Sequence, residues 1–532
     1  MMKLIPSPYQ LIHLTKLRAN DQNCLLITDG VGVGKTISSG YVIYQQSRIE
    51  KMPVLVVCPP ILLDKWRAEL SSKFQLESKL ANKPETFSLM IDEIENRDKD
   101  KFGEIYITSY SILSRVDFRK APEIGLIVMD EIHTARNPKT KFFPILRTLC
   151  ESSEFRIGLS ATPINNSTND LAAIQSLLTP RFSYRELSSM LEDLWGLPIT
   201  DCLSCISTRF TKDDVASHFT SRDIVSVGIN YPDVYNEYVR SSIDSRFSPS
   251  DGFQLQTVSV HRLAASSPAA FQKSFNAKKM PEFTDTKIER LKEIIESKPD
   301  ERFLIFTEFR ETANYIARNI EDRLILQTSG DSNLEEREAN AFLFKQSDAS
   351  IMIMTPVGSE GLDYQFCSNL VNYDLHWNPM KIEQRIGRID RIGQKKKVVT
   401  VYNFHVYGSI DERVRDVIGD KLSLVSGTFA DVNSIIEGNQ SFSQTQIGDE
   451  VVKKETEQAD SFVKSMHLLR KTHSMDSEIA KKLEPSNCTF SEWNNLDWGA
   501  VPWIREVEDW NNQLKIESDN FSDLMKMYTV KR

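Results

Sequence analysis

The stretch that decides the fold is Cys24-Leu-Leu-Ile-Thr-Asp-Gly-Val-Gly-Val-Gly-Lys-Thr36, and a helical pattern follows it from Ile37 to Gln46. Cys24–Ile27 is a short apolar run, which predicts a buried parallel strand. A strand, a glycine-rich loop and a helix in this order are the context that a phosphate-binding loop requires. The stretch therefore predicts an α/β unit that binds a nucleotide.

The loop residues have separate expected roles. Gly32 and Gly34 let backbone N–H groups approach phosphate oxygens, and the helix N-terminus adds its dipole. Lys35 should reach the β- and γ-phosphates, and the Thr36 hydroxyl should coordinate Mg²⁺. The strict pattern has glycine where this chain has Asp29. The residues expected to bind ATP here are Asp29, Gly30, Gly32, Val33, Gly34, Lys35 and Thr36.

A second apolar run, Leu126–Met129, predicts a strand that ends in Asp130 and Glu131. In an enzyme with a phosphate loop, Asp130 should hold Mg²⁺, directly or through water, and Glu131 should orient and deprotonate the attacking water. Strands that end in acidic residues are also common without any catalytic role. The presence of Lys35 favours the catalytic interpretation.

The stretch Lys381–Lys397 combines two periodicities. Arg385, Arg388 and Arg391 recur every three residues, so on a helix they would share one face. Isoleucines 382, 386, 389 and 392 recur at three and four, which predicts a buried stripe. An ordinary amphipathic helix would explain the isoleucines, but not a glutamine, three arginines and two glycines in this order.

Gln384–Gln394 resembles the arginine-finger motif of superfamily-two helicases, and its final Arg-Ile-Gly-Gln resembles the Swi/Snf-type translocases. With Gly358–Phe366 and Leu375–Pro379, the chain is most similar to the bacterial RapA/HepA branch of that family. The resemblance covers residues 6–421. It implies an α/β fold with two RecA-like parallel-sheet lobes, a helical insertion and a C-terminal helical extension. The expected divisions are lobe 1 at residues 1–164, the insertion at 165–284, lobe 2 at 285–430, and a linker with an acidic, Trp-containing extension at 431–532.

The resemblance also assigns roles to single residues. Gln10 would read the adenine edge, because an amide can donate and accept at once. Arg388 and Arg391 would be arginine fingers, whereas Arg385 would brace the interface or the DNA side. Gly361 and Asp363 would also contact the nucleotide. The residues expected to couple the ATP site to lobe movement are His133, Ser160, Ala161, Thr162 and Gln384.

The function that the resemblance implies is an ATP-dependent double-stranded-DNA translocase with ATP and Mg²⁺ as cofactors. DNA would be bound through its backbone phosphates, without direct base readout. Two alternatives remain open. One is a helicase that separates DNA or RNA strands. The other is a DNA-activated ATPase switch subunit of a larger complex, such as a phage-defence or transcription-associated assembly. A protein partner could bind the helical insertion or the C-terminal extension.

Composition sets broad bounds on these expectations. At 532 residues, with 40% hydrophobic and 26% charged residues, the chain should form at least two globular units. The sequence contains no run of about 18 apolar residues, so we expect no transmembrane helix, and we expect no signal peptide. We therefore expect a cytoplasmic protein, nucleoid-associated if bacterial. The net charge is −9, of which about −6 lies in residues 431–532, so charge does not decide the partner. Cys202 and Cys205 form an isolated C-x-x-C, for which we expect reduced thiols.

Overall fold

The structure is a computed structural model that describes residues 10, 12–13, 16–17, 23–117, 121–161, 168–193, 206–210, 220–246, 254–275, 280–330, 332–355, 364–376, 379–391, 393–409 and 412. The described residues divide into two compact units, the first up to residue 210 and the second from residue 220. Each unit is described by itself. The C-terminal extension, with Trp493, Trp498, Trp503 and Trp510, lies outside the described residues, and so do Cys202 and Cys205.

The first unit is built on a seven-stranded sheet in which all the described pairings are parallel, in the order β3-β4-β2-β5-β6-β1-β7. The strands are β1 (Cys24–Ile27), β2 (Val54–Cys58), β3 (Lys79–Leu80), β4 (Ile105–Ser109), β5 (Ile124–Asp130), β6 (Ser153–Leu159) and β7 (Ser207–Thr208). The central strands are buried on both faces, which explains why their sequences are continuous apolar runs. The expected strands at residues 24–27 and 126–129 are confirmed.

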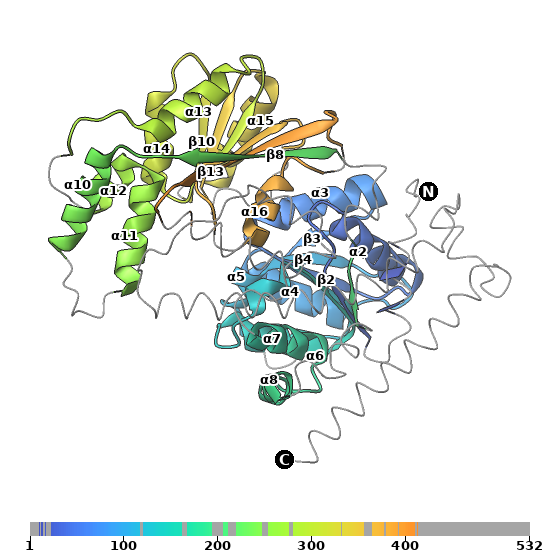
Figure 1. Ribbon diagram of the computed structural model, residues 1–532. Coiled ribbons are helices and arrows are strands. Elements are labelled where there is room, and N and C mark those ends of the chain that lie inside the picture. The colour runs from blue at the N-terminus through green and yellow to red at the C-terminus, as the bar shows by residue number, and fades with distance from the viewer. Residues whose placement is uncertain are drawn as a thin grey trace. The chain divides into compact units, whose positions relative to one another are not determined.

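Helices cover both faces of this sheet, as Figure 1 shows for α2 and α3 on one side and α6 and α7 on the other. The helices are α2 (Lys35–Tyr44), α3 (Leu63–Phe74), α4 (Pro84–Glu95), α5 (Tyr110–Leu113), α6 (Phe142–Glu151), α7 (Thr168–Leu178) and α8 (Tyr184–Asp193). One core cluster joins alternate strand residues to Tyr41 of α2 and to Trp66 and Phe74 of α3. Gly40 is needed at this contact, because an added Cβ would lie 2.3 Å from the Phe74 ring.

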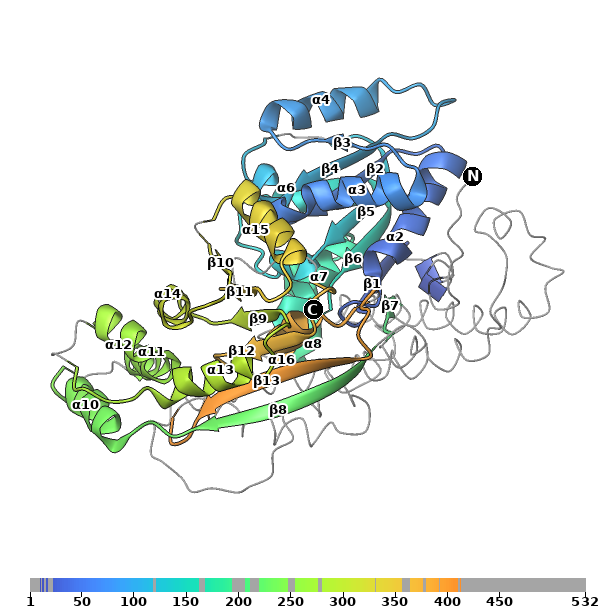
Figure 2. The same ribbon diagram turned by 90° about the horizontal axis from the view of Figure 1, so that it is seen from above.

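The second unit contains a six-stranded sheet, again parallel in all its described pairings, in the order β10-β11-β9-β12-β13-β8. Its strands are β8 (Ser221–Ile229), β9 (Phe303–Phe306), β10 (Ile325–Thr328), β11 (Ile351–Met354), β12 (Asn369–Asn372) and β13 (Val398–Val406). Figure 2 shows β8 at the edge of the sheet beside β13, with which it pairs over nine residues. Two parallel α/β sheets confirm the expected fold class.

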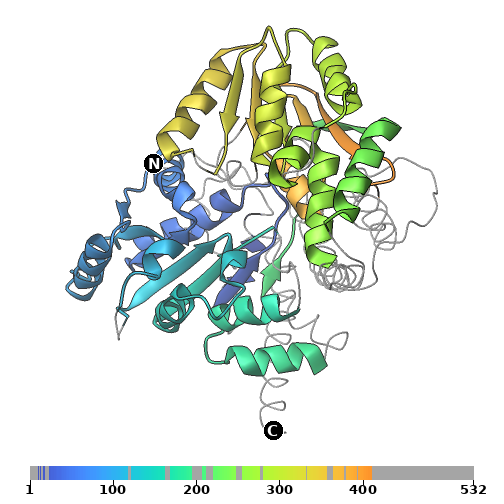
Figure 3. The ribbon, with the colours of Figure 1, turned by 90° about the vertical axis from the view of Figure 1, so that its left-hand side faces the viewer.

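The helices of the second unit are α10 (Asp233–Asp244), α11 (Gln254–Ser266), α12 (Pro268–Phe275), α13 (Thr286–Glu296), α14 (Arg310–Asn319), α15 (Leu334–Gln346) and α16 (Pro379–Ile386). One core cluster contains residues from the five helices α10–α14 and from strands β8, β9, β11, β12 and β13. The green helices α10–α12 therefore pack on this unit (Figure 3). None of the helices among the described residues is long and apolar enough to span a bilayer.

The segment 165–284, expected to be a helical insertion, contains helices but also two strands of the sheets. β7 extends the first sheet and β8 extends the second. The sequence of β8 hides this role because an edge strand is only partly buried, and its apolar residues are interrupted by Arg222, Asp223 and Ser226. The domain limits given above remain predictions.

Candidate functional site

The carboxyl ends of three neighbouring strands carry the predicted catalytic residues of the first unit. β1 leads into the phosphate loop, β5 ends at Asp130, and Ser160 follows β6, which lies between β1 and β5. Parallel strands place their carboxyl ends at one edge of the sheet, where ligands of open α/β sheets bind. The fold therefore brings Lys35, Thr36, Asp130, Glu131 and Ser160 to the same edge.

The phosphate loop has the backbone that close approach to a phosphate requires. Gly32 and Gly34 have φ values of +84° and +102°, in the left-handed region that favours glycine. Gly34 precedes α2, and its carbonyl oxygen accepts the first hydrogen bonds of that helix, from Ile37 and Ser38. The first turn of α2 itself contains no acidic residue, so the positive end of the helix dipole faces the phosphate loop without a carboxylate of its own helix.

Lys35 is folded back on its own loop. Its Nζ donates to the carbonyl oxygens of Asp29, at 3.0 Å, and Gly30, at 3.3 Å. Burial lowers the pKa of Lys35, although the nearby carboxylates of Glu131, Asp29 and Asp130 oppose this shift. Anionic phosphate oxygens could replace the two carbonyl acceptors without moving the loop backbone, and they would complement the charge of the lysine.

Asp29 was expected to contact ATP, but its carboxylate contacts other parts of the protein. One carboxylate oxygen accepts from the backbone N–H of Phe210 at 3.0 Å, and the other lies 3.0 Å from Nε2 of His13. Both side chains of the His13–Asp29 pair are fully buried. The backbone N–H of Gly30 donates to the Phe210 carbonyl, and the Arg209 guanidinium donates to the Thr28 carbonyl. Residues 206–210 are thus tied to the phosphate loop.

Asp130 is held by two aromatic side chains. The Trp66 indole N–H donates to its Oδ2 at 2.8 Å, and the Tyr110 hydroxyl donates to its carbonyl oxygen at 2.8 Å. Burial and the neighbouring Glu131 carboxylate raise the pKa of Asp130 to about 6, while Trp66 and Lys35 oppose the rise. A divalent cation beside Asp130 would offset the cost of burying its charge and the repulsion from Glu131, which suits a Mg²⁺ ligand; the Thr36 hydroxyl is the second ligand that the sequence predicts.

Glu131, His133 and Ser160 form a chain of polar contacts at the same edge. Glu131 has a φ of +49°, a left-handed conformation that costs a non-glycine residue about 1–3 kcal/mol and is concentrated at functional sites. His133 Nδ1 lies 3.2 Å from Oε2 of Glu131 and 3.2 Å from Oγ of Ser160. The Ser160 backbone N–H donates to Ile27 of β1. These contacts connect the predicted base to two strands, as a coupling role requires.

The remaining predicted residues of the first unit are distributed as follows. Gln10 and Ala161 are buried, and the Ala161 carbonyl oxygen accepts from Arg209 at 3.4 Å. Val33 is fully buried under the loop, and Gly30 is partly exposed. Thr162 lies outside the described residues, as do Gly361 and Asp363 of the second unit.

In the second unit, the expectation of three arginines on one helix face is wrong. α16 ends at Ile386, and Gly387 follows it, a residue that disfavours helix continuation. The next backbone bonds are those of a turn, from the N–H of Arg388 to Arg385 and from that of Ile389 to Ile386. Arg385 therefore lies on the helix, and Arg388 and Arg391 lie on the turn. Ile382, Ile386 and Ile389 are buried as expected, and Ile392 lies outside the described residues.

Arg385 differs from the other two arginines in its surroundings. It is buried and donates to Oδ1 of Asn372 at 3.1 Å, to the Asp374 carbonyl at 2.9 Å and to the Glu308 carboxylate. Arg388 and Arg391 are partly exposed, and so is Gln384. Arg385 fastens α16 to the ends of β9 and β12.

Sequence reasoning missed several residues of the site. Arg209 and Phe210 follow β7, and Arg222 lies on β8, in a segment with no recognised motif. Trp66 and Tyr110, to which the sequence assigned no role, are both buried and hydrogen-bonded to Asp130. The apolar spacing of Trp66, Leu70 and Phe74 in α3 signals their burial, but no local signal pairs Trp66 with a residue 64 positions away.

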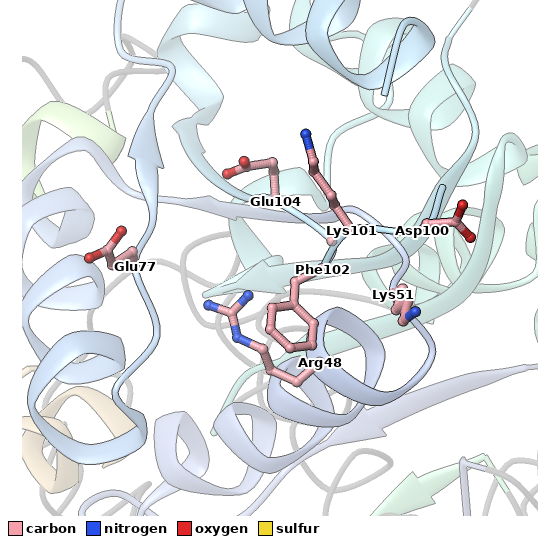
Figure 4. Close-up of a pocket in the computed structure, with 8 residues that line it drawn as sticks. Arg48, Lys51, Glu77, Asp100, Lys101, Phe102 and Glu104 are labelled. Carbon is pink, nitrogen blue, oxygen red and sulfur yellow. The ribbon is translucent and has the colours of Figure 1, made fainter. Parts of the chain in front are cut away.

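A cavity of about 520 Å³ lies elsewhere in the first unit, lined by Arg48, Lys51, Glu77, Asp100, Lys101, Phe102, Gly103 and Glu104. Lys51 and Gly103 precede β2 and β4, so the cavity is at the amino ends of these strands, opposite the phosphate loop. Figure 4 shows the Phe102 ring beside the Arg48 guanidinium, which lies 4.9 Å from the ring centroid. Acidic and basic side chains line the cavity in equal number, so its charge favours no one class of ligand.

Comparison with known proteins finds two family patterns in the chain. The pattern of the SNF2-related domain matches residues 9–209, and that of the helicase conserved C-terminal domain matches residues 286–393. The chain is similar to the uncharacterized ATP-dependent helicase YqhH of Bacillus subtilis (strain 168), with 26% identity over 478 residues that cover 81% of each chain. The SNF2-related match begins just before Gln10, and the helicase C-terminal match ends at Gly393, within the arginine motif.

The chain is also similar to the RNA polymerase-associated protein RapA of Vibrio parahaemolyticus, with 24% identity over 458 residues. The match covers 74% of this chain and 47% of RapA, so the chain spans about half the length of that relative. Among solved structures it is similar to the Sulfolobus solfataricus SWI2/SNF2 ATPase core in complex with dsDNA, at 24% identity, covering 82% of this chain and 98% of that one. The TM-score is 0.37, too low for a comparison of how the elements are arranged.

Proposed function

We propose that this chain, which belongs to the SNF2-related ATPase family and has a helicase C-terminal domain, uses ATP hydrolysis to move along double-stranded DNA or to remodel protein–DNA complexes. The observation that carries the proposal is the convergence of the phosphate loop and the Asp130–Glu131 pair at one edge of the first sheet. The choice of DNA as the substrate rests on the resemblance of the motifs to those of Swi/Snf-type translocases.

The residues of the first unit divide the work on ATP. The loop N–H groups and Lys35 bind the phosphates, and Gln10 reads the adenine edge. Thr36 and Asp130 hold Mg²⁺, which neutralises charge on the phosphate oxygens when bound. Glu131 orients the attacking water and takes its proton, while His133 and Ser160 connect that event to β1 and β6.

The second unit supplies Arg388 and Arg391, which act as arginine fingers on the phosphoryl group being transferred. Both lie on the turn that follows α16, both are partly exposed, and Arg385 anchors that helix to Asp374. Such fingers stabilise charge that develops in the transition state. Opening and closing of the two units with the ATP cycle would then move the protein along the DNA backbone. As part of the same proposal, this activity takes place in the cytoplasm, on the nucleoid if bacterial.

The test of the activity is the ATPase rate with no nucleic acid, duplex DNA, single-stranded DNA and RNA. We expect duplex DNA to stimulate turnover most, and a triplex-forming strand to be displaced from duplex DNA without unwinding of the duplex. Unwinding of a forked duplex would favour a strand-separating helicase. Stimulation by a protein partner alone, with no displacement, would favour a switch subunit.

The test of the fingers uses Arg388→Ala and Arg391→Ala, which should each lower DNA-stimulated turnover by about 10³-fold or more, with a much smaller change in ATP affinity. Lysine should rescue poorly, because it lacks the planar fork of a guanidinium. Arg323→Ala is the matched control. Arg323 donates to the carbonyls of Glu301, Ile295 and Lys298, so its loss should lower the thermal midpoint and leave turnover intact. Normal turnover in both finger variants would refute the assignment.

A further inference from the structure

Arg222 makes an ion-pair cluster with two acidic residues of the arginine motif. It lies at the second position of β8, and its two terminal nitrogens contact the carboxylate of Glu383 at 2.9 and 2.6 Å. Its Nε contacts Oδ2 of Asp390 at 2.5 Å. The three side chains are 7%, 8% and 1% exposed, so the cluster is almost fully buried. All three belong to the second unit.

The cluster brackets the turn that carries the proposed fingers. Glu383 lies on α16, ahead of the turn, and Asp390 lies on the turn between Arg388 and Arg391. The second oxygen of Asp390 accepts from the Thr220 hydroxyl at 3.1 Å, so both of its oxygens are bound by the chain around the start of β8. One guanidinium therefore fixes the distance between the end of α16 and the finger-bearing turn.

Other contacts hold the same turn from the opposite side. The Arg388 carbonyl accepts from the backbone N–H of Tyr364, and Gln394 Nε2 donates to the Ile389 carbonyl at 2.9 Å. Arg385 anchors the preceding helix to Asp374 and Asn372. These contacts fix the backbone of the turn, whereas Arg222 is bonded to the side chain that sits directly between the two fingers.

Strand attachment does not account for this cluster. β8 pairs with β13 in a register that runs from Ser221 with Val398 to Ile229 with Val406, so its place in the sheet is fixed by backbone hydrogen bonds. Burying an arginine between two carboxylates has a large desolvation cost. Such ion pairs add little stability where backbone hydrogen bonds already specify the structure. The geometry does, however, orient a turn whose side chains must meet a reacting group, and a misplacement of about 1 Å can cost about 100-fold in rate.

We propose that Arg222 is a positioning residue for ATP hydrolysis, which sets the turn between Glu383 and Asp390 so that Arg388 and Arg391 are aimed at the phosphoryl group. This inference rests on the proposed arginine-finger function. It assigns a role to β8, the first described element of the second unit: the chain entering this unit is fastened to the finger turn within a few residues of Ser217.

The test compares Arg222→Lys, Arg222→Ala and Asp390→Asn in the full chain, with kcat, KM for ATP and thermal midpoint measured for each. Arg222→Lys keeps one positive charge but cannot bridge two carboxylates with a planar fork. We expect kcat of each folded variant to fall by about tenfold or more, with KM for ATP within about twofold of the parent. Arg323→Ala is the control for stability, because it should lower the thermal midpoint without lowering kcat. If Arg222→Ala fails to fold, Arg222→Lys and Asp390→Asn still decide the question.

A combined variant separates positioning from a purely structural role. If Arg222 acts through Arg388 and Arg391, then Arg222→Lys added to the Arg388→Ala/Arg391→Ala variant should slow it by less than about threefold. Losses that multiply in full, or an Arg222→Lys variant with normal kcat, would overturn the inference. Normal turnover in Arg388→Ala and Arg391→Ala would instead overturn the finger assignment. The two failures are therefore distinguishable.

Discussion

Replacing Trp66 with phenylalanine should weaken the activation of ATP hydrolysis by Mg²⁺ in a pH-dependent way. The Trp66 indole donates its hydrogen bond to the carboxylate of Asp130, which we propose holds the metal. Burial and the Glu131 carboxylate raise the pKa of Asp130 to about 6, and the Trp66 hydrogen bond opposes that rise. Phenylalanine keeps an aromatic ring in the core but has no N–H to donate, so the pKa of Asp130 should rise further.

The size of the effect follows from the hydrogen bond. A hydrogen bond to a charged group contributes about 1.5–3 kcal/mol, and one pKa unit is about 1.36 kcal/mol, so the pKa should rise by about 1–2 units. Protons then compete with Mg²⁺ for the carboxylate. Near pH 7, the Mg²⁺ concentration at half-maximal activity should rise about 2- to 10-fold, and near pH 9 by less than about 1.2-fold.

The assay is ATP turnover against Mg²⁺ concentration at the two pH values. Tyr110→Phe is the matched control, because Tyr110 also donates a 2.8 Å bond to Asp130, but to its backbone carbonyl. This control should lower the thermal midpoint and leave the Mg²⁺ dependence unchanged at both pH values. A shift in Trp66→Phe that is equal at the two pH values, or the same shift in Tyr110→Phe, would refute the reasoning.

The remaining predictions concern the base, the DNA and the second unit. Glu131→Gln should bind ATP normally and lose hydrolysis, because an amide cannot take the proton from water; near-normal phosphate release would mean that the base is another residue. Binding to duplex DNA should weaken with salt, with a log–log slope of about 0.9 for each phosphate neutralised, and a salt titration should give the same slope for randomised sequences. Burial favours a raised pKa for Asp374, but Lys287 and the hydrogen bonds from Thr307, Glu308 and Ser266 hold it below its usual range. This carboxylate therefore stabilises the fold above about pH 4, its unfolded pKa, and the contribution is lost as the pH falls through the lower folded value. Asp374→Asn should lower the thermal midpoint at neutral pH, because Lys287 stays buried, and should flatten its decline on acidification; an unchanged acid profile would contradict this assignment.

The parts of the site that were predictable from sequence are those encoded by adjacent residues. The loop between β1 and α2 is local, and its glycines, Lys35 and Thr36 lie where the pattern placed them. The strand before Asp130 is a continuous apolar run because it is buried on both faces. Both signals depend on backbone conformation and burial over fewer than about twelve residues, which is the range over which hydrophobic periodicity is informative.

The parts that were not predictable depend on pairing across long separations. Arg222 contacts Glu383 and Asp390, which follow it by 161 and 168 positions, and no local pattern couples them. The end of α16 was also misjudged, because a spacing of three suits a helix and a tight turn equally well over a few residues. Gly387 was the available signal for the turn, and the isoleucine stripe continued past it because Ile389 is buried by the turn itself.

The contact between the phosphate loop and residues 206–210 has a consequence for the order of events during synthesis. Thr28 and Thr208, which bond to each other across β1 and β7, are 180 positions apart. At a translation rate of about 5–20 residues per second, about 10–35 s separate their appearance at the ribosome. Among the described residues of the unit, the nucleotide loop is thus made early and its support is made last. A nascent first unit should therefore acquire its mature affinity for ATP only after Phe210 has emerged, when nearly all of its sheet is already in place.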